Sequence, residues 1–185
     1  MQNLGEEIAG AWLQIEEHCE FVQYNLQTTD IQGEIDVLGI NIERHTVYLC
    51  EVAIHLATGI QYVGKTNQPD NVVRFLKKFN KDIDYAEKNF ADYTKVYMLW
   101  SPIVKNQSQK AKHNQLNDVL AVQQELRNKR SVELQLIINE QFQTCLDRLR
   151  QYAAGTKKEL KSPVLRYLQI EECLKKHLKQ LSKNK

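Results

Sequence analysis

The sequence lacks the features of membrane-spanning, zinc-finger and disulfide-stabilised proteins. Its 185 residues contain no apolar run long enough to cross a bilayer. The first residues, Met-Gln-Asn-Leu-Gly-Glu-Glu, lack the basic start and apolar core of a signal peptide. The four cysteines form no Cys-x-x-Cys pair, so we expect buried free thiols rather than a metal or disulfide framework. These absences predict a cytoplasmic protein that has no membrane partner.

Basic residues are nearly absent from the first third of the chain. Residues 1–60 contain ten acidic residues and one basic residue, whereas residues 61–140 contain nine acidic and thirteen basic residues. Residues 141–185 contain four acidic and eleven basic residues. An acidic segment followed by a basic remainder indicates an anionic partner, with DNA first among nucleic acids. The alternative is that the lysine-rich helices merely present solvated faces.

Hydrophobic periodicity predicts an α/β domain. Hydrophobic residues make up 42% of the chain and charged residues 26%, as in a globular domain. Predicted helices cover 4–18, 72–90, 115–127, 142–154 and 163–181, and predicted strands cover 19–26, 94–104, 132–138 and a hairpin within 33–55. This order favours a mixed central β-sheet with helices on both faces. A glycine-rich phosphate loop and a nucleophile elbow are both absent from the sequence.

The chain divides into a core and a basic C-terminal part. We expect residues 1–155 to form the core, and residues 156–185 to form a basic linker and an amphipathic helix that packs on it. The apolar residues predicted to face inward on this last helix are Tyr167, Leu174, Leu178 and Leu181. The same stripe is an alternative candidate for a homodimer contact.

Two carboxylates occupy the apolar strands of the predicted hairpin. If its turn centres between Glu43 and Arg44, the residue numbers of each facing pair add up to 87. Asp36 then faces Glu51. Their Cβ atoms would lie about 5 Å apart. Facing buried carboxylates repel and lose hydration, and a Mg²⁺ or Mn²⁺ ion between them would remove both penalties. Alternatively, the turn lies one residue away and both acids reach solvent.

The flanking helices carry further charged candidates. In the first helix, Glu7 borders the apolar stripe and Glu6 lies on its flank. The stripe itself consists of Leu4, Ile8, Ala11, Trp12 and Ile15. Basic residues crowd the helix that follows the hairpin, namely Arg74, Lys77, Lys78 and Lys81.

The segment from residue 4 to about residue 104 resembles the PD-(D/E)XK nuclease superfamily. Its early helix starts Gly5-Glu6, and the hairpin reads Glu34-Ile35-Asp36 and then Cys50-Glu51-Val52-Ala53. The pattern is most similar to the resolvase-like and restriction-endonuclease-like branches. The resemblance implies a restriction-endonuclease-like core that hydrolyses phosphodiester bonds in DNA.

Residue roles follow from the resemblance position by position. It implies that Asp36 and Glu51 bind Mg²⁺, with Glu6 or Glu7 assisting. The backbone carbonyl of Val52 is a further candidate ligand. A cation held in this way would activate a water molecule and screen the scissile phosphate.

The chain departs from the superfamily at one important position. The superfamily's lysine should lie two residues after the second hairpin carboxylate, where this chain has Ala53. A lysine from elsewhere would have to enter the site, and the candidates are Lys65, Lys77 and Lys78. His55 shares a face with the hairpin carboxylate and is a candidate base or phosphate contact. The alternatives are an inactive nuclease fold that binds DNA or a protein partner, and an unrelated α/β protein.

Overall fold

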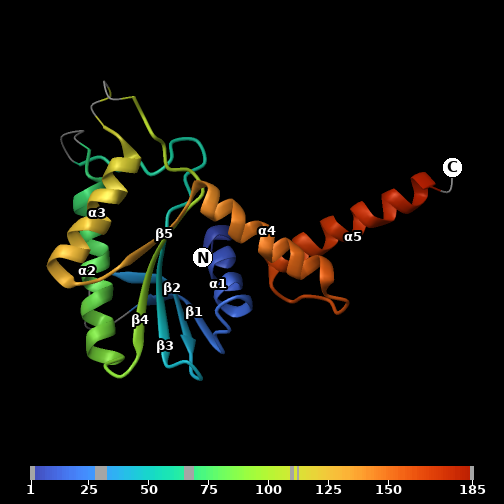
Figure 1. The fold of residues 1–185 in the computed structure, drawn as a ribbon, viewed down its shortest axis with the longest axis horizontal. Helices are drawn as coiled ribbons and strands as arrows, with labels where there is room; N and C mark the ends of the chain where they lie inside the picture. Colours follow the sequence, from blue (N-terminus) through green and yellow to red (C-terminus); the bar gives the residue numbers. More distant parts are fainter. Residues whose placement is uncertain (1–2, 28–32, 65–68, 109–110, 112, 184–185) are drawn as a thin grey trace.

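The computed structural model describes residues 3–27, 33–64, 69–108, 111 and 113–183. They form a mixed α/β fold with a five-stranded sheet in the order β1-β2-β3-β4-β5 (Figure 1). The fold class is therefore confirmed, whereas its relation to restriction endonucleases stays a prediction. Residues 28–32, between the first predicted strand and the predicted hairpin, lie outside the described residues.

The sheet combines an antiparallel half with a parallel half. Strands β1 to β3 pair as an antiparallel meander, and β4 and β5 continue the sheet parallel to β3. Long crossovers containing helices join the parallel strands, as parallel pairing requires. The strands are β1 (Phe21–Gln27), β2 (Glu34–Asn41), β3 (Thr46–Val52), β4 (Thr94–Ser101) and β5 (Leu134–Ile138).

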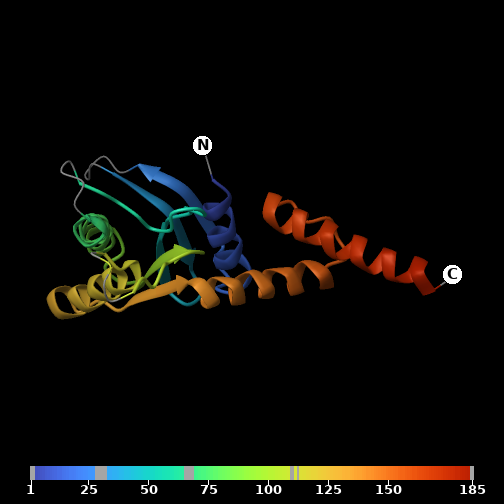
Figure 2. The same cartoon turned by 90° about the horizontal axis from the view of Figure 1, so that it is seen from above.

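Helices cover both faces of the sheet (Figure 2). Helices α2 (Asn71–Asn89) and α3 (Gln115–Arg130) lie on one face, and α1 (Leu4–Ile15) and α4 (Asn139–Gly155) lie on the other. Helix α5 (Pro163–Lys183) contacts α4 and α1 at its start. Two hydrophobic layers result, because successive strand residues point to opposite faces. None of the helices in the described ranges is long and apolar enough to cross a membrane.

Several element ends differ from the sequence prediction. Helix α1 ends at Ile15 rather than at residue 18, where His18 has a left-handed φ of 54° that an α-helix does not allow. Strand β3 ends at Val52, so His55 lies in the loop beyond it. In the loop beyond β3, an isolated bridge joins Val63 to Pro69.

The inward face of the last helix was predicted wrongly. Its buried apolar residues are Val164, Leu165 and Leu168, which pack against α4 and α1. The four residues predicted to face inward, Tyr167, Leu174, Leu178 and Leu181, are all exposed. Helix α5 thus has two apolar faces, and periodicity alone does not tell which of them packs on the core.

Candidate functional site

The two hairpin carboxylates meet at one end of the β2–β3 pair. The pairing of Val37 with Cys50 confirms the predicted register, and its continuation places Asp36 opposite Glu51. Asp36 is 6% exposed and Glu51 is 1% exposed. The backbone N–H of Val52 donates to Asp36 Oδ2 at 2.7 Å, instead of continuing the pairing of β3 with β2. This hydrogen bond orients the Asp36 carboxylate at the end of β3.

Lys78 reaches both carboxylates from helix α2. Its Nζ lies 3.6 Å from Asp36 Oδ2 and donates a hydrogen bond to Glu51 Oε2. Burial opposes the charge of the ammonium, but the carboxylates of Glu51 and Asp36 outweigh burial and raise the pKa of Lys78. The ammonium is therefore held charged between two acids that come from adjacent strands.

Asp82 belongs to the same cluster and was not among the predicted residues. It lies one helical turn after Lys78, on the same face of α2. Its side chain is buried beside Glu51, and burial raises the pKa of Asp82 to about 7. The sequence did contain a signal: Asp82 interrupts the apolar stripe of α2 formed by Phe75, Phe79, Ile83 and Ala86.

The cluster holds more negative groups than positive ones. Burial and the neighbouring Asp36 raise the pKa of Glu51 well above its usual value. Burial also raises the pKa of Asp36, although Lys78 opposes this shift. Two buried oxygens, Glu51 Oε1 and Asp82 Oδ2, have no hydrogen-bond donor in the part of the chain that the structure describes. Because ionised carboxylates cannot donate to each other, a shared proton or a cation would satisfy both oxygens.

The chemistry of these donors fits a magnesium-type ion. Carboxylate oxygens suit Mg²⁺, which commonly keeps several waters and uses only one or two carboxylates. Among the described residues, no group of three or more His, Cys, Asp or Glu side chains has the arrangement of a metal site. A resident ion would therefore rest on two carboxylates and water. The predicted role of the Val52 carbonyl as a ligand stays a prediction.

The orientation of α1 buries Glu6 but leaves Glu7 partly exposed. Glu6 is buried and accepts a hydrogen bond from Asn25 Nδ2 at 3.0 Å, and its charge contributes to the raised pKa of Asp36. Burial raises the pKa of Glu7, and the neighbouring charge of Glu6 adds to this shift. The predicted stripe of α1 was partly wrong, because Leu4 is exposed whereas Glu6 faces the sheet.

A groove of about 840 Å³ opens beside the carboxylate cluster. Glu51 and Asp82 line it together with basic side chains of α2, namely Arg74, Lys77, Lys78 and Lys81. The groove thus has acids at its buried end and basic side chains along α2. Lys77 is exposed and lines this groove, while Lys65 lies outside the described residues.

His55 lies at the margin of the site rather than beside Glu51. It is exposed, and its ring packs edge-on against Tyr62 with the ring centres 5.7 Å apart. The guanidinium of Arg74 lies over the ring of Tyr62, 4.3 Å from the centre of that ring. Tyr62 therefore links His55 to helix α2, and the predicted role of His55 as a base stays a prediction.

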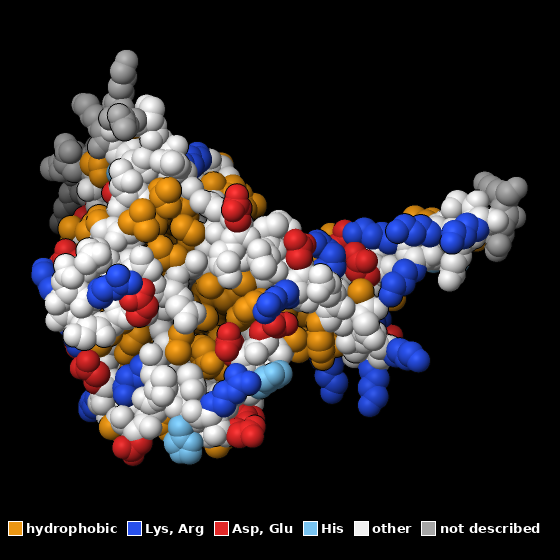
Figure 3. Space-filling view, viewed as in Figure 1, with side chains coloured by type: hydrophobic (Ala, Val, Ile, Leu, Met, Phe, Trp, Pro, Cys, Tyr) orange, Lys and Arg blue, Asp and Glu red, His pale blue; other side chains and the backbone are white. Residues whose placement is uncertain are grey.

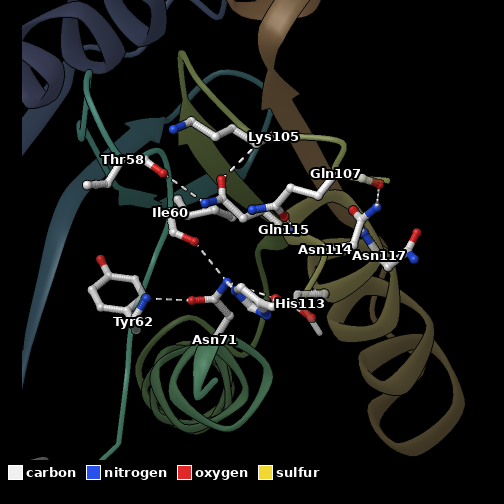
Figure 4. A network of polar contacts seen from close by, with 11 residues as sticks. Thr58, Ile60, Tyr62, Asn71, Lys105, Gln107, His113, Asn114, Gln115 and Asn117 are labelled. Carbon is white, nitrogen blue, oxygen red and sulfur yellow. Dashed lines mark hydrogen bonds and ion pairs between the residues drawn. The ribbon is translucent and has the colours of Figure 1, made fainter. Parts of the chain in front are cut away.

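A polar network holds the loop that follows β3 in place (Figure 4). The buried side chain of Asn71 accepts from the Tyr62 N–H and donates to the Ile60 carbonyl, each at 2.8 Å. From α3, Gln115 donates to the Thr58 carbonyl at 2.8 Å. The starts of α2 and α3 thereby position the loop that follows β3.

The sequence matches no model of a known protein family and no curated protein. The chemistry of the site itself must therefore indicate what it does. Buried carboxylates, one ammonium and an adjacent groove lined by basic side chains can hold a divalent cation next to a phosphate.

Proposed function

We propose that this protein is a Mg²⁺- or Mn²⁺-dependent endonuclease of the PD-(D/E)XK type that hydrolyses phosphodiester bonds in DNA. The observation that supports the proposal most is the position of Lys78. The resemblance requires a lysine ammonium beside the hairpin carboxylates, and Ala53 cannot supply one. Lys78 reaches the same carboxylates from the next helix. The missing motif lysine is therefore no obstacle to catalysis.

Three residues of the cluster, Asp36, Glu51 and Lys78, have a defined part in this proposal. Asp36 and Glu51 would hold the cation, and Glu51 can use Oε1 while its Oε2 keeps the hydrogen bond to Lys78. When bound, Mg²⁺ supplies a Lewis acid for the phosphate and lowers the pKa of a coordinated water. The ammonium of Lys78 would orient the attacking water and stabilise the negative charge that develops on the phosphate.

The basic side chains of α2 support a polyanionic substrate. Arg74 and Lys77 line the groove beside the carboxylate cluster. Lysine and arginine side chains provide the sequence-independent part of DNA affinity by neutralising phosphates. They would position the backbone along α2, so that one phosphate lies at the buried end of the groove.

A cleavage assay tests this function. Supercoiled and linear DNA are incubated with the protein in Mg²⁺, in Mn²⁺ and in EDTA, and we expect cleavage only with a metal. Asp36→Asn should abolish cleavage. Glu34→Gln is the matched control, because Glu34 lies exposed on the same strand and lines the same groove. Cleavage that persists in Asp36→Asn would refute the assignment of this site.

Metal binding is measured separately by thermal unfolding. A cation at about 100 times its Kd stabilises the folded state by about 2.7 kcal/mol, so Mg²⁺ should raise the Tm of the wild type but not of Glu51→Gln. Salt-sensitive DNA binding without cleavage in any metal would instead indicate an inactive nuclease fold. Neither binding nor cleavage would indicate that the carboxylate cluster has another role.

A further inference from the structure

The second half of helix α5 projects from the rest of the protein (Figures 1 and 2). Its first turns are anchored by Val164, Leu165 and Leu168, which pack on α4 and α1. From residue 173 to residue 183, every residue is exposed. Figure 3 shows lysine side chains along this projecting arm. An exposed, projecting helix that carried only polar side chains would need no partner, but this helix is not polar all round.

Five large apolar residues form a continuous line on α5, which we call the terminal stripe. They are Tyr167, Ile170, Leu174, Leu178 and Leu181, and their exposed fractions lie between 50% and 67%. At about 100° per residue, they fall within an arc of about 80°. The centre of this arc lies about 130° around the helix from the face that packs on α4 and α1. The terminal stripe is therefore a separate apolar surface.

The spacing of the terminal stripe is symmetric. Successive members are 3, 4, 4 and 3 residues apart, so the pattern reads the same in both directions from Leu174. A second copy of α5, turned by a two-fold axis at Leu174, would place Tyr167 against Leu181 and Ile170 against Leu178. Every contact would then occur twice, which is the property of a self-complementary dimer interface.

The charges of α5 favour the same antiparallel arrangement. Glu171 and Lys175 flank the terminal stripe on the same side, about 60° and 100° from its centre, and within one helix their charged atoms lie 3.0 Å apart. In an antiparallel pair about Leu174, the Glu171 of each helix also lies on the same side as the Lys175 of the other. Opposite charges that flank an apolar seam help to set the orientation of a helix pair. Charge complementarity thus favours the antiparallel orientation of the second copy.

We propose that the protein forms a symmetric homodimer in which the terminal stripes of two α5 helices pack antiparallel about Leu174. The occupant of the stripe is a second copy of this chain. The interface lies away from α2 and the carboxylate cluster (Figure 2), so it does not depend on the proposed nuclease activity. Packing the stripe removes from water the large apolar side chains that the monomer exposes.

The mass of the protein in solution is the first test. The chain has a mass of 21.6 kDa, and light scattering should show a species of twice that mass at micromolar concentrations. Leu174→Glu places two carboxylates at the axis and should give a monomer. Gln180→Glu adds the same charge to an exposed position off the stripe and should remain dimeric. A wild-type monomer at all concentrations, or a dimeric Leu174→Glu variant, overturns the proposal.

Cross-linking tests the orientation. Cys173 is the exposed thiol beside the axis, whereas Cys19, Cys50 and Cys145 are buried. Helices packed in this way lie about 8–10 Å apart, so a short bis-maleimide should join two Cys173 side chains. In a Cys173→Ser background, a mixture of Tyr167→Cys and Leu181→Cys should form a mixed disulfide. Self-pairing of Leu181→Cys alone would show a parallel pair and refute the antiparallel interface. Circular dichroism confirms that each variant is folded.

Discussion

Replacing Lys78 by methionine removes the positive charge of the carboxylate cluster while keeping much of the side-chain volume. The ammonium contacts Asp36 and Glu51, and both carboxylates are buried. Methionine leaves these acids without a cation, so their pKa values should rise further. The loss should be largest at neutral pH and smaller at pH 5, because protonated carboxyls need no counter-charge.

The structure sets the size of this effect. At the 3.6 Å separation of Lys78 Nζ and Asp36 Oδ2, the gross attraction is about 5 kcal/mol for an effective dielectric constant of about 20. Desolvation of the charges offsets much of this attraction. The Lys78 side chain is also 37% exposed, so solvent screens it further. We expect Lys78→Met to lower the free energy of unfolding by about 2 kcal/mol at neutral pH.

Urea unfolding in EDTA, followed by far-UV circular dichroism, measures this loss. Lys77→Met is the matched control, because Lys77 is exposed on the same helix and its replacement should change stability by less than about 0.5 kcal/mol. In the cleavage assay, Lys78→Met should reduce the rate about 100-fold or more. Equal stability losses for the two variants, or cleavage by Lys78→Met at the wild-type rate, would refute the role assigned to Lys78.

Two further predictions concern the interior around the site. Because burial raises the pKa of Asp82 to about 7, the folded protein holds a proton that the unfolded chain releases near pH 4, so wild-type stability without metal should fall as pH rises from 4 towards 7. Asp82→Asn should flatten this dependence in urea titrations between pH 5 and pH 8, and an unchanged slope would contradict the assignment. Asn71→Ala should cost about 3 kcal/mol of unfolding free energy, because the Tyr62 N–H and the Ile60 carbonyl lose their buried partner. The exposed Asn128→Ala on α3 is its control, and a loss below about 1 kcal/mol for Asn71→Ala would refute the importance of this network.

Helix α2, which carries Lys78 of the carboxylate cluster, and the projecting part of α5 lie on different sides of the protein (Figure 2). The cluster lies beneath α2, whereas the terminal stripe belongs to the projecting part of α5. Substitutions in one are therefore not expected to disturb the other directly. Leu174→Glu should leave the stability difference between each cluster variant and its parent protein unchanged, which allows the two proposals to fail independently.

The local pattern of the sequence was sufficient to predict the hairpin and its register. Alternating apolar residues and a short polar turn specify two antiparallel strands, and the side-chain period of two makes a one-residue shift costly. The register could therefore be obtained by arithmetic, and the pairing of Val37 with Cys50 agrees with it. The ends of the strands were less predictable, because the Val52 N–H is taken by the Asp36 carboxylate.

The amphipathic pattern was not sufficient to predict which faces of α1 and α5 are buried. In α1, the predicted stripe placed Glu6 on the flank, whereas the helix is rotated so that Glu6 is buried. In α5, the pattern contains two apolar faces, and only the one with Leu165 and Leu168 packs within the chain. A hydrophobic face shows that a helix needs a partner surface but does not identify that surface.

The sequence by itself determined that Asp36 and Glu51 face each other, because strand pairing across a short turn is a local property. It also supplied Lys78 as one of several lysines able to replace the missing motif lysine. Only the tertiary structure decided that Lys78 and Asp82 join the carboxylates. Helical periodicity sets which residues share a face of α2, but the position of that helix over β3 depends on long-range packing of the two hydrophobic layers.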